Sequence, residues 1–223
     1  ANEQPSLETT FEFYRRLSET VRLALRRSPP YILAGAILLY VVFFSYLSIT
    51  TQYIFGTGAH DVGVYDQVIW LLSRFLPPYS TLGGVLLFGF HVSGYCILFA
   101  PLFWLWDNIN LLFIAQSLLL GLTAVPVYLY AQRELKSSWL ALVAGLLLLL
   151  YPALQNMNLE NFHPEAAIVF FLSWATYFML TKNWRWYYPW LALALLGKEE
   201  LGVVAVFMGL YLLLFKKETK HGV

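Results

Sequence analysis

The chain of 223 residues is 59% hydrophobic and only 12% charged, and its mean hydropathy is +0.62. So few charges cannot cover the surface of a water-soluble domain of this length, and several apolar runs reach the roughly 20 residues that cross a bilayer. The composition therefore predicts an all-α polytopic membrane protein. The net charge of +1 leaves no basic face for nucleic acid, and the single cysteine, Cys96, excludes an internal disulfide and a cysteine metal cage.

Residues 1–30 are polar and basic, and their apolar side chains recur at helical spacing. The basic residues of this segment are Arg15, Arg16, Arg22, Arg26 and Arg27. The pattern predicts an amphipathic helix lying on the cytoplasmic surface of the membrane. The apolar run that follows, 31–54, is too long for the core of a cleaved signal peptide, so we interpret it as a retained transmembrane anchor.

Two segments after this anchor decide the topology. Residues 61–75 carry one apolar stripe, which predicts a helix lying on the outer face of the membrane. Residues 82–106 are apolar and long enough to span, but the run is interrupted by Gly83, Gly84, Gly89, Gly94 and Pro101. We therefore predict that 82–106 stays in the outer interface as a second juxtamembrane segment.

Further spans are predicted at 109–131, 138–155, 164–181, 186–197 and 201–215. If 82–106 does not cross, twelve of the 14 lysines and arginines lie in the cytoplasm, namely the five N-terminal arginines with Arg133, Lys136, Lys182, Arg185, Lys216, Lys217 and Lys220. If it crosses, only six do. Because loop lysines and arginines set orientation, we predict six spans within a transmembrane domain at 31–215. Both termini, including a basic tail at 216–223, then face the cytoplasm.

This topology places every candidate for chemistry on the outer side. Asp61 begins the segment 61–75, where it serves as the helix N-cap or as a catalytic carboxylate, and the first role does not exclude the second. Asp66, Trp70 and Arg74 follow on one helical face. A solvated polar stripe is the simpler explanation for these three, and a substrate-binding surface is the alternative.

The outward histidines are ambiguous in the same way. His91 lies in an aromatic patch, where a histidine is more often a hydrogen-bonded interfacial residue than a ligand contact. His163 and Glu165 share one short loop, and Pro164 favours a helix start there. Glu165 is therefore either a helix-start acid or a functional carboxylate. The two histidines could ligate haem or chlorophyll between helices, although their spacing does not require it.

Lys198, Glu199 and Glu200 interrupt a long apolar stretch at 186–215. The arm before them has about 12 residues and rises roughly 18 Å, which is short of the roughly 30 Å hydrocarbon core. We therefore expect the triplet below the outer surface, where ionised groups must be paired or lie in a wet cavity. An ion pair of Lys198 with Glu199 or Glu200 is one interpretation, and a functional site is the other.

Taken in order, these motifs have a counterpart in known sequences. DVGVYDQ at 61–67, His91, YPALQ at 151–155, NFHPE at 161–165 and KEE at 198–200 resemble a prokaryotic family of polytopic membrane proteins defined as a domain of unknown function. The resemblance covers roughly residues 31–215. That family looks like a distant branch of the GT-C glycosyltransferases, which take sugars from polyprenyl-phosphate carriers.

The resemblance implies a GT-C-like N-terminal module with juxtamembrane helices in its first outer loop. The position that matches the general base of GT-C enzymes is Asp61, and a second acidic position falls near His163 and Glu165. We expect Glu165 or Glu199 to assist the base through a hydrogen bond or a metal, and the sequence leaves open whether a divalent cation takes part.

The physical logic of such a reaction suggests roles for the other outward residues. Lys198 and Arg74 are the outward cations available to the donor phosphate. Tyr65 and Trp70 can stack on a sugar ring. The remaining substrate-binding candidates are Asp66, His91, His163 and Glu200.

The partners expected on this interpretation are membrane lipids and a polyprenyl-phosphate sugar donor. The alternative function is a non-catalytic subunit of a larger membrane assembly, with lipid or pigment bound between its helices and other membrane subunits as partners. A transporter is disfavoured because the cytoplasmic halves of the predicted spans carry no acidic or polar path.

Overall fold

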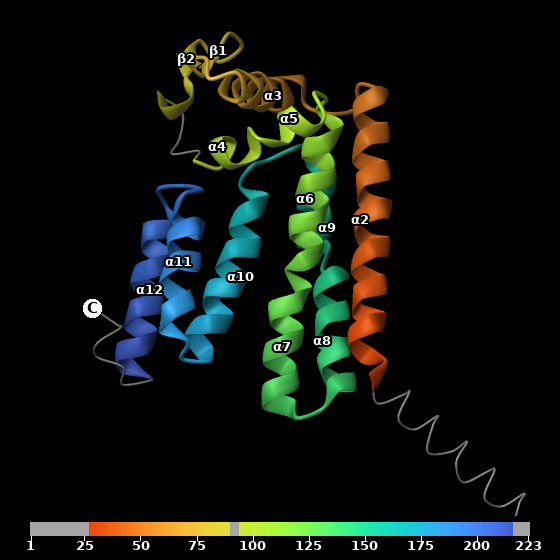
Figure 1. Ribbon diagram of the computed structural model, residues 1–223, viewed down its shortest axis with the longest axis vertical. Coiled ribbons are helices and arrows are strands. Elements are labelled where there is room, and N and C mark those ends of the chain that lie inside the picture. The colour runs from red at the N-terminus through yellow and green to blue at the C-terminus, as the bar shows by residue number, and fades with distance from the viewer. Residues whose placement is uncertain (1–26, 90–93, 216–223) are drawn as a thin grey trace, which may run out of the picture.

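The computed structural model describes residues 27–89 and 94–215 (Figure 1). In these ranges the regular secondary structure is nearly all α-helix, with a single two-stranded hairpin of β1 (Tyr79–Ser80) and β2 (Val85–Leu86). The strands are antiparallel, with Tyr79 opposite Leu86. Most of the predicted segment 1–30, the tail 216–223 and the candidate His91 lie outside the described residues.

Eight helices stand upright beside one another and form the body of the molecule (Figure 1). They are α2 (Pro29–Tyr53), α6 (Asn110–Leu122), α7 (Ala124–Leu135), α8 (Ser138–Leu149), α9 (Pro152–Glu160), α10 (Ala166–Leu180), α11 (Trp184–Leu195) and α12 (Leu201–Leu214). Two stretches are long and apolar enough to cross a membrane. One is α2 with 25 residues, and the other is α6 together with α7, which run on as one helix of 26 residues from Asn110 to Leu135. Counted as one bent span, α8 and α9 make a third. The described residues thus hold two or three helices that can cross a membrane, as in an integral membrane protein.

The other predicted spans depart from simple transmembrane helices. The predicted span 138–155 stops at Leu149, Tyr151 is extended, and Pro152 begins α9 after a bend of 42°. Proline has no N–H to donate and forces the preceding residue out of the helical region, which accounts for the break. With 12 and 14 residues, α11 and α12 rise about 18 Å and 21 Å, less than the hydrocarbon core of about 30 Å.

The upright helices run in alternating directions when α6 with α7, and α8 with α9, are each counted as one pass. One end of the body holds the end of α2, the start of α6, the end of α9, the start of α10 and the α11–α12 connection (Figure 1). The α7–α8 and α10–α11 connections lie at the opposite end. The chain therefore makes six upright passes, and these correspond to the six segments predicted as spans.

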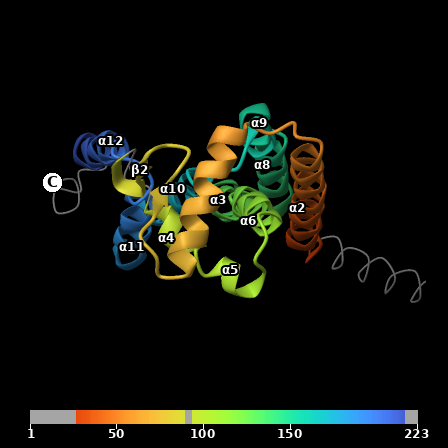
Figure 2. The same cartoon turned by 90° about the horizontal axis from the view of Figure 1, so that it is seen from above.

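A lateral layer covers the first of these ends. It consists of α3 (Ala59–Ser73), the β1–β2 hairpin, the 3-10 turn η1 (Leu87–Gly89), α4 (Tyr95–Phe99) and α5 (Leu102–Leu105). Seen from above, α3 crosses over the ends of the upright helices (Figure 2). Within its described part, the predicted segment 82–106 is broken into short elements, and its longest apolar helical stretch, Tyr95–Leu105, is shorter than a span.

An aromatic core joins the lateral layer to the upright helices. Its centre is Phe162, which lies in the loop between α9 and α10 and is 0% exposed. The ring of Phe162 makes edge contacts with Tyr65 of α3, Phe99 of α4 and Phe113 of α6, at centroid distances of 6.3, 5.5 and 6.5 Å. Aromatic pairs of this geometry contribute about 0.5–1.5 kcal/mol each beyond their buried area. Phe162 therefore fixes the loop that carries His163 and Glu165 against three elements at once.

Candidate functional site

The loop 161–165 is also held by polar side chains. Gln116 of α6 is fully buried; its Nε2 donates to the carbonyl of Asn161 at 3.0 Å, and its Oε1 accepts from the backbone N–H of His163 at 2.8 Å. Asn161 Oδ1 in turn accepts from the N–H of Gly58 at 2.7 Å, immediately before α3. Since buried backbone groups must be paired, these bonds set the loop at a defined height between α6 and α3.

A second buried polar cluster holds α9, the helix that leads into this loop. Ser117 of α6 donates to Asn158 Oδ1 at 3.0 Å, and Ser48 of α2 donates to the carbonyl of Asn158 at 2.9 Å. All three residues are almost fully buried. Hydrogen bonds between apolar helices fix their relative rotation, so the orientation of α9 is tied to α2 and α6.

The centre of the candidate site is the carboxylate of Glu165, directly before α10. Its side chain is only 14% exposed. Glu165 Oε1 accepts a hydrogen bond from the Tyr65 hydroxyl at 3.1 Å and lies 3.4 Å from Lys198 Nζ. Glu165 Oε2 is buried and has no hydrogen-bond partner among the described residues, and it lies 4.0 Å from His163 Nδ1. Tyr65, His163, Glu165 and Lys198 thus form one group, called here the Glu165 cluster, drawn from three distant stretches of the chain.

The cluster contains a phenol that stays protonated. Burial raises the pKa of Tyr65 far above its usual range, and the neighbouring Glu165 carboxylate raises it further. Because the neutral phenol has the proton and the carboxylate has the lone pairs, Tyr65 donates and Glu165 accepts. The Tyr65 ring also contacts the His163 ring edge-on at 6.4 Å. Tyr65 is therefore a fixed donor to one oxygen of Glu165, and the other oxygen has no hydrogen-bond donor in the part of the chain that the structure describes.

The position of Lys198 depends on close packing at the end of α11. The Tyr95 hydroxyl donates to the carbonyls of Leu193 and Ala194 at 2.9 Å each, and the Gly94 N–H donates to Leu196 O at 2.9 Å. The carbonyls of Leu193 and Ala194 also accept from the backbone N–H groups of Leu196 and Gly197, at 3.3 and 3.2 Å, so the last turn of α11 is tied both within itself and to Tyr95. The α11–α12 connection lies lower than α3 in Figure 1. The short arm of α11 thus delivers Lys198 beneath the lateral layer, level with the start of α10.

Lys198 meets a different acid from the two proposed on sequence. The sequence suggested Glu199 or Glu200 as its partner, and the structure pairs Lys198 with Glu165 across the α10–α11 boundary. Glu199 and Glu200 are exposed on the same turn. A lysine can reach an acid on a neighbouring helix more easily than the adjacent residues of a tight turn, because consecutive side chains there point apart.

Asp61 does not cap α3. The N-cap position is Gly58, and Asp61 lies in the first helical turn with its side chain 52% exposed. A negative charge there is favoured by the helix dipole. His60 Nδ1 lies 3.6 Å from Asp61 Oδ1. Asp61 precedes Tyr65 by one turn on the same face of α3 and is close enough to add to the raised pKa of that phenol.

Asp66, Trp70 and Arg74, predicted on one face of the helix, take part in two separate arrangements. Trp70 and Arg74 contact Asp107, and Asp66 lines a pocket. Arg74 pairs with Asp107 at 2.6 Å and stacks over the Trp70 ring at 5.6 Å, and Trp70 Nε1 donates to the same carboxylate oxygen at 3.4 Å. Arg74 lies about 14 Å further along α3 than Tyr65, at 1.5 Å per residue. Arg74 is therefore paired with Asp107, whereas Lys198 is paired with Glu165.

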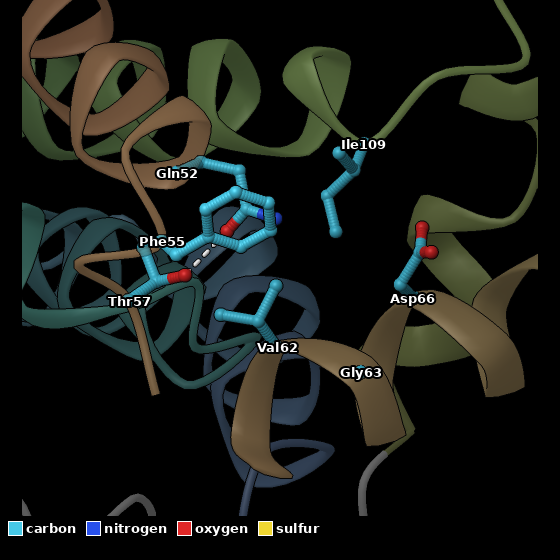
Figure 3. A pocket seen from close by; sticks show the side chains of 7 residues that line it. All are labelled: Gln52, Phe55, Thr57, Val62, Gly63, Asp66 and Ile109. Carbon is cyan, nitrogen blue, oxygen red and sulfur yellow. Dashed lines mark hydrogen bonds between the residues drawn. The ribbon is translucent and has the colours of Figure 1, made fainter. Parts of the chain in front are cut away.

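Asp66 faces a separate pocket (Figure 3). Burial, and secondly the negative charge of Asp107, raise the pKa of Asp66 to about 6. Across residues 27–89 and 94–215, no point gathers three or more histidine, cysteine, aspartate or glutamate side chains that could hold a metal.

Sequence reasoning missed Gln116, Asn158 and Asp107. Gln116 and Asn158 carry a signal that could have found them, because polar side chains inside apolar helices usually have a structural or functional partner. Asp107 lies between a tryptophan and an asparagine in the sequence and carries no such signal.

Residues 51–223 match the family model described as "Predicted membrane protein (DUF2079)". No curated protein and no solved structure matches the chain.

Proposed function

Because the chain belongs to the DUF2079 family of predicted membrane proteins, we propose that it is a GT-C-like glycosyltransferase module that uses a polyprenyl-phosphate-linked sugar at the outer face of the membrane. The proposal has two parts, a membrane topology and a reaction at the Glu165 cluster.

In the proposed topology all six upright passes enter the membrane, the lateral layer lies on the outer face, and both termini are cytoplasmic. The alternating directions of the passes in Figure 1 support this arrangement. The count of lysines and arginines supports its orientation. The short helices α11 and α12 then leave the Lys198 turn within the outer part of the bilayer, at a depth where a phosphate on a lipid carrier can meet it.

In the proposed reaction the donor enters sideways between helices, and Lys198 binds its phosphate. Asp61 accepts the proton of an acceptor hydroxyl while that oxygen attacks the anomeric carbon. The bond between the anomeric carbon and the phosphate oxygen breaks, and the lipid phosphate leaves with the electron pair. Glu165 and Tyr65 are positioning residues in this scheme, because they hold Lys198 in place before the donor arrives.

The observation that carries the proposal is the pairing of Lys198 with Glu165 beneath the lateral layer. The side chain of Lys198 remains 36% exposed, so it can contact a ligand without leaving Glu165. Within residues 27–89 and 94–215, its partner acid keeps one buried oxygen without a hydrogen bond. Such an unsatisfied buried group costs about 1–3 kcal/mol or more when charged, a cost that a bound ligand can remove.

The test is a transfer assay in proteoliposomes with a panel of polyprenyl-phosphate sugars, in which release of polyprenyl phosphate is measured. Asp61→Asn should lower turnover by about 10²–10⁴-fold, the usual contribution of a general base. The matched control Glu160→Gln removes an exposed acid at the end of α9 and should keep wild-type turnover. Equal turnover in Asp61→Asn and wild type, or no release from any donor, would instead favour the non-catalytic membrane subunit.

A further inference from the structure

A pocket lies on another side of α3 from the Glu165 cluster. It has a volume of about 230 Å³ and opens between the end of α2, the first turns of α3 and the residue before α6 (Figure 3). Its lining includes Gln52, Phe55, Thr57, Val62 and Asp66. Consecutive helical residues point about 100° apart, so the side chains of Tyr65 and Asp66 lie on different faces of α3.

The pocket offers an acceptor and a donor that are both available to a ligand. Thr57 Oγ1 donates a hydrogen bond to Gln52 Oε1, which fixes the amide and leaves its Nε2 as the outward donor. Asp66 supplies a carboxyl group that points into the same space (Figure 3). Within the described part of the chain, neither the Asp66 carboxyl nor Gln52 Nε2 has a hydrogen-bond partner. A ligand that both donates and accepts can therefore satisfy both groups.

An aromatic ring is held at this pocket at a conformational cost. Phe55 is 94% exposed and has φ of +58°, a left-handed backbone that bulky residues rarely adopt. Such a conformation costs on the order of 1–3 kcal/mol and persists where the surroundings impose it. The surroundings here include the hydrogen bonds from Phe55 N to Gln52 O and from Gly56 N to Thr51 O. The Phe55 ring lies beside Gln52 and Thr57 in the pocket (Figure 3).

We propose that this pocket binds one neutral sugar ring. The sugar hydroxyls bridge the Asp66 carboxyl and the Gln52 amide, and the C–H face of the ring packs on Phe55. The volume is below the roughly 300–1,000 Å³ of pockets for drug-sized ligands, which limits the occupant to a single ring. An ammonium group fits less well, because the Gln52 N–H dipole repels a cation and one aromatic ring does not make a cage. The sugar pocket stands on its own geometry and does not require that the chain transfers sugars.

The test measures binding of methyl glucoside, methyl mannoside and methyl galactoside to the full chain. Binding is detected by saturation-transfer NMR in a detergent without a sugar headgroup. Gln52→Glu keeps the acceptor for Thr57 and replaces the donor, so sugar binding should weaken at least tenfold. Asp66→Leu removes the carboxyl oxygens and should weaken binding to the same degree. Glu160→Gln, outside the pocket, and Lys198→Met, in the Glu165 cluster, should bind as the wild type does.

Several outcomes would overturn the sugar pocket. These are the absence of sugar binding to the wild type, wild-type affinity in both Gln52→Glu and Asp66→Leu, and loss of binding in Lys198→Met. The ammonium alternative has its own signature, since choline would bind to the wild type and bind more tightly to Gln52→Glu. Failure of the transferase proposal would leave the sugar-binding result unchanged, so the two proposals fail separately.

Discussion

Gly197→Ala should destabilise the protein by about 1–3 kcal/mol, the usual effect of one extra methyl group in a close-packed site. A Cβ atom at Gly197 would lie 2.5 and 2.7 Å from two side-chain carbons of Ile168 and 2.7 Å from Tyr95 Cε2. Favourable contacts between carbon atoms lie at about 3.5–4.0 Å. The end of Ile168 can turn away, but Tyr95 is held by its two hydroxyl contacts to the end of α11. The turn that carries Lys198 must therefore move.

The assay is thermal unfolding of the purified protein in detergent, and near-UV circular dichroism monitors the loss of tertiary structure. A loss of 1–3 kcal/mol corresponds to a fall in Tm of about 2–12 °C for a chain of this size. Gly202→Ala is the matched control, because a Cβ there meets nothing within 4 Å. Alanine is favoured over glycine inside a helix by about 0.8–1.0 kcal/mol, so this control should hold or raise the Tm. Equal Tm values for Gly197→Ala and Gly202→Ala would refute the packing argument.

The remaining predictions concern Asp66 and the topology. The pKa of Asp66 is raised to about 6, above about 3.9 in an unfolded chain, so the folded state binds more protons and loses stability as pH rises from about 4 to 6. Asp66→Asn should therefore stabilise the protein at pH 7 by about 1–2 kcal/mol, after a discount for partial exposure. The gain should vanish below pH 4, and a gain independent of pH would contradict the assignment. For the topology, single cysteines at positions 134 and 183 in a Cys96→Ala background should resist impermeant thiol reagents in intact cells, and labelling at either would reverse the orientation.

The elements that were predictable from sequence are those set by local pattern. The first apolar run became α2 because nothing interrupts it, and the single apolar stripe of 61–75 became α3. The described part of 82–106 is broken where its glycines and Pro101 occur. In each case the signal lies within the segment itself.

The features that were not predictable depend on contacts between distant segments. The pairing of Lys198 with Glu165 requires the packing of α10 against α11, and the need for glycine at 197 arises from Tyr95 and Ile168. The role of Gln116 similarly appears only when the 161–165 loop is brought against α6. Spacing along one sequence does not specify such neighbours.

The most direct test of the proposed site is equilibrium binding of polyprenyl monophosphate to the full chain in lipid nanodiscs. A contact between a charged amine and phosphate contributes about 1.5–3 kcal/mol, so Lys198→Met should bind at least tenfold more weakly than the wild type. The control is Lys136→Met, at the opposite end of the body between α7 and α8, and it should bind normally. Wild-type affinity in Lys198→Met, or no binding by the wild type itself, would contradict the account.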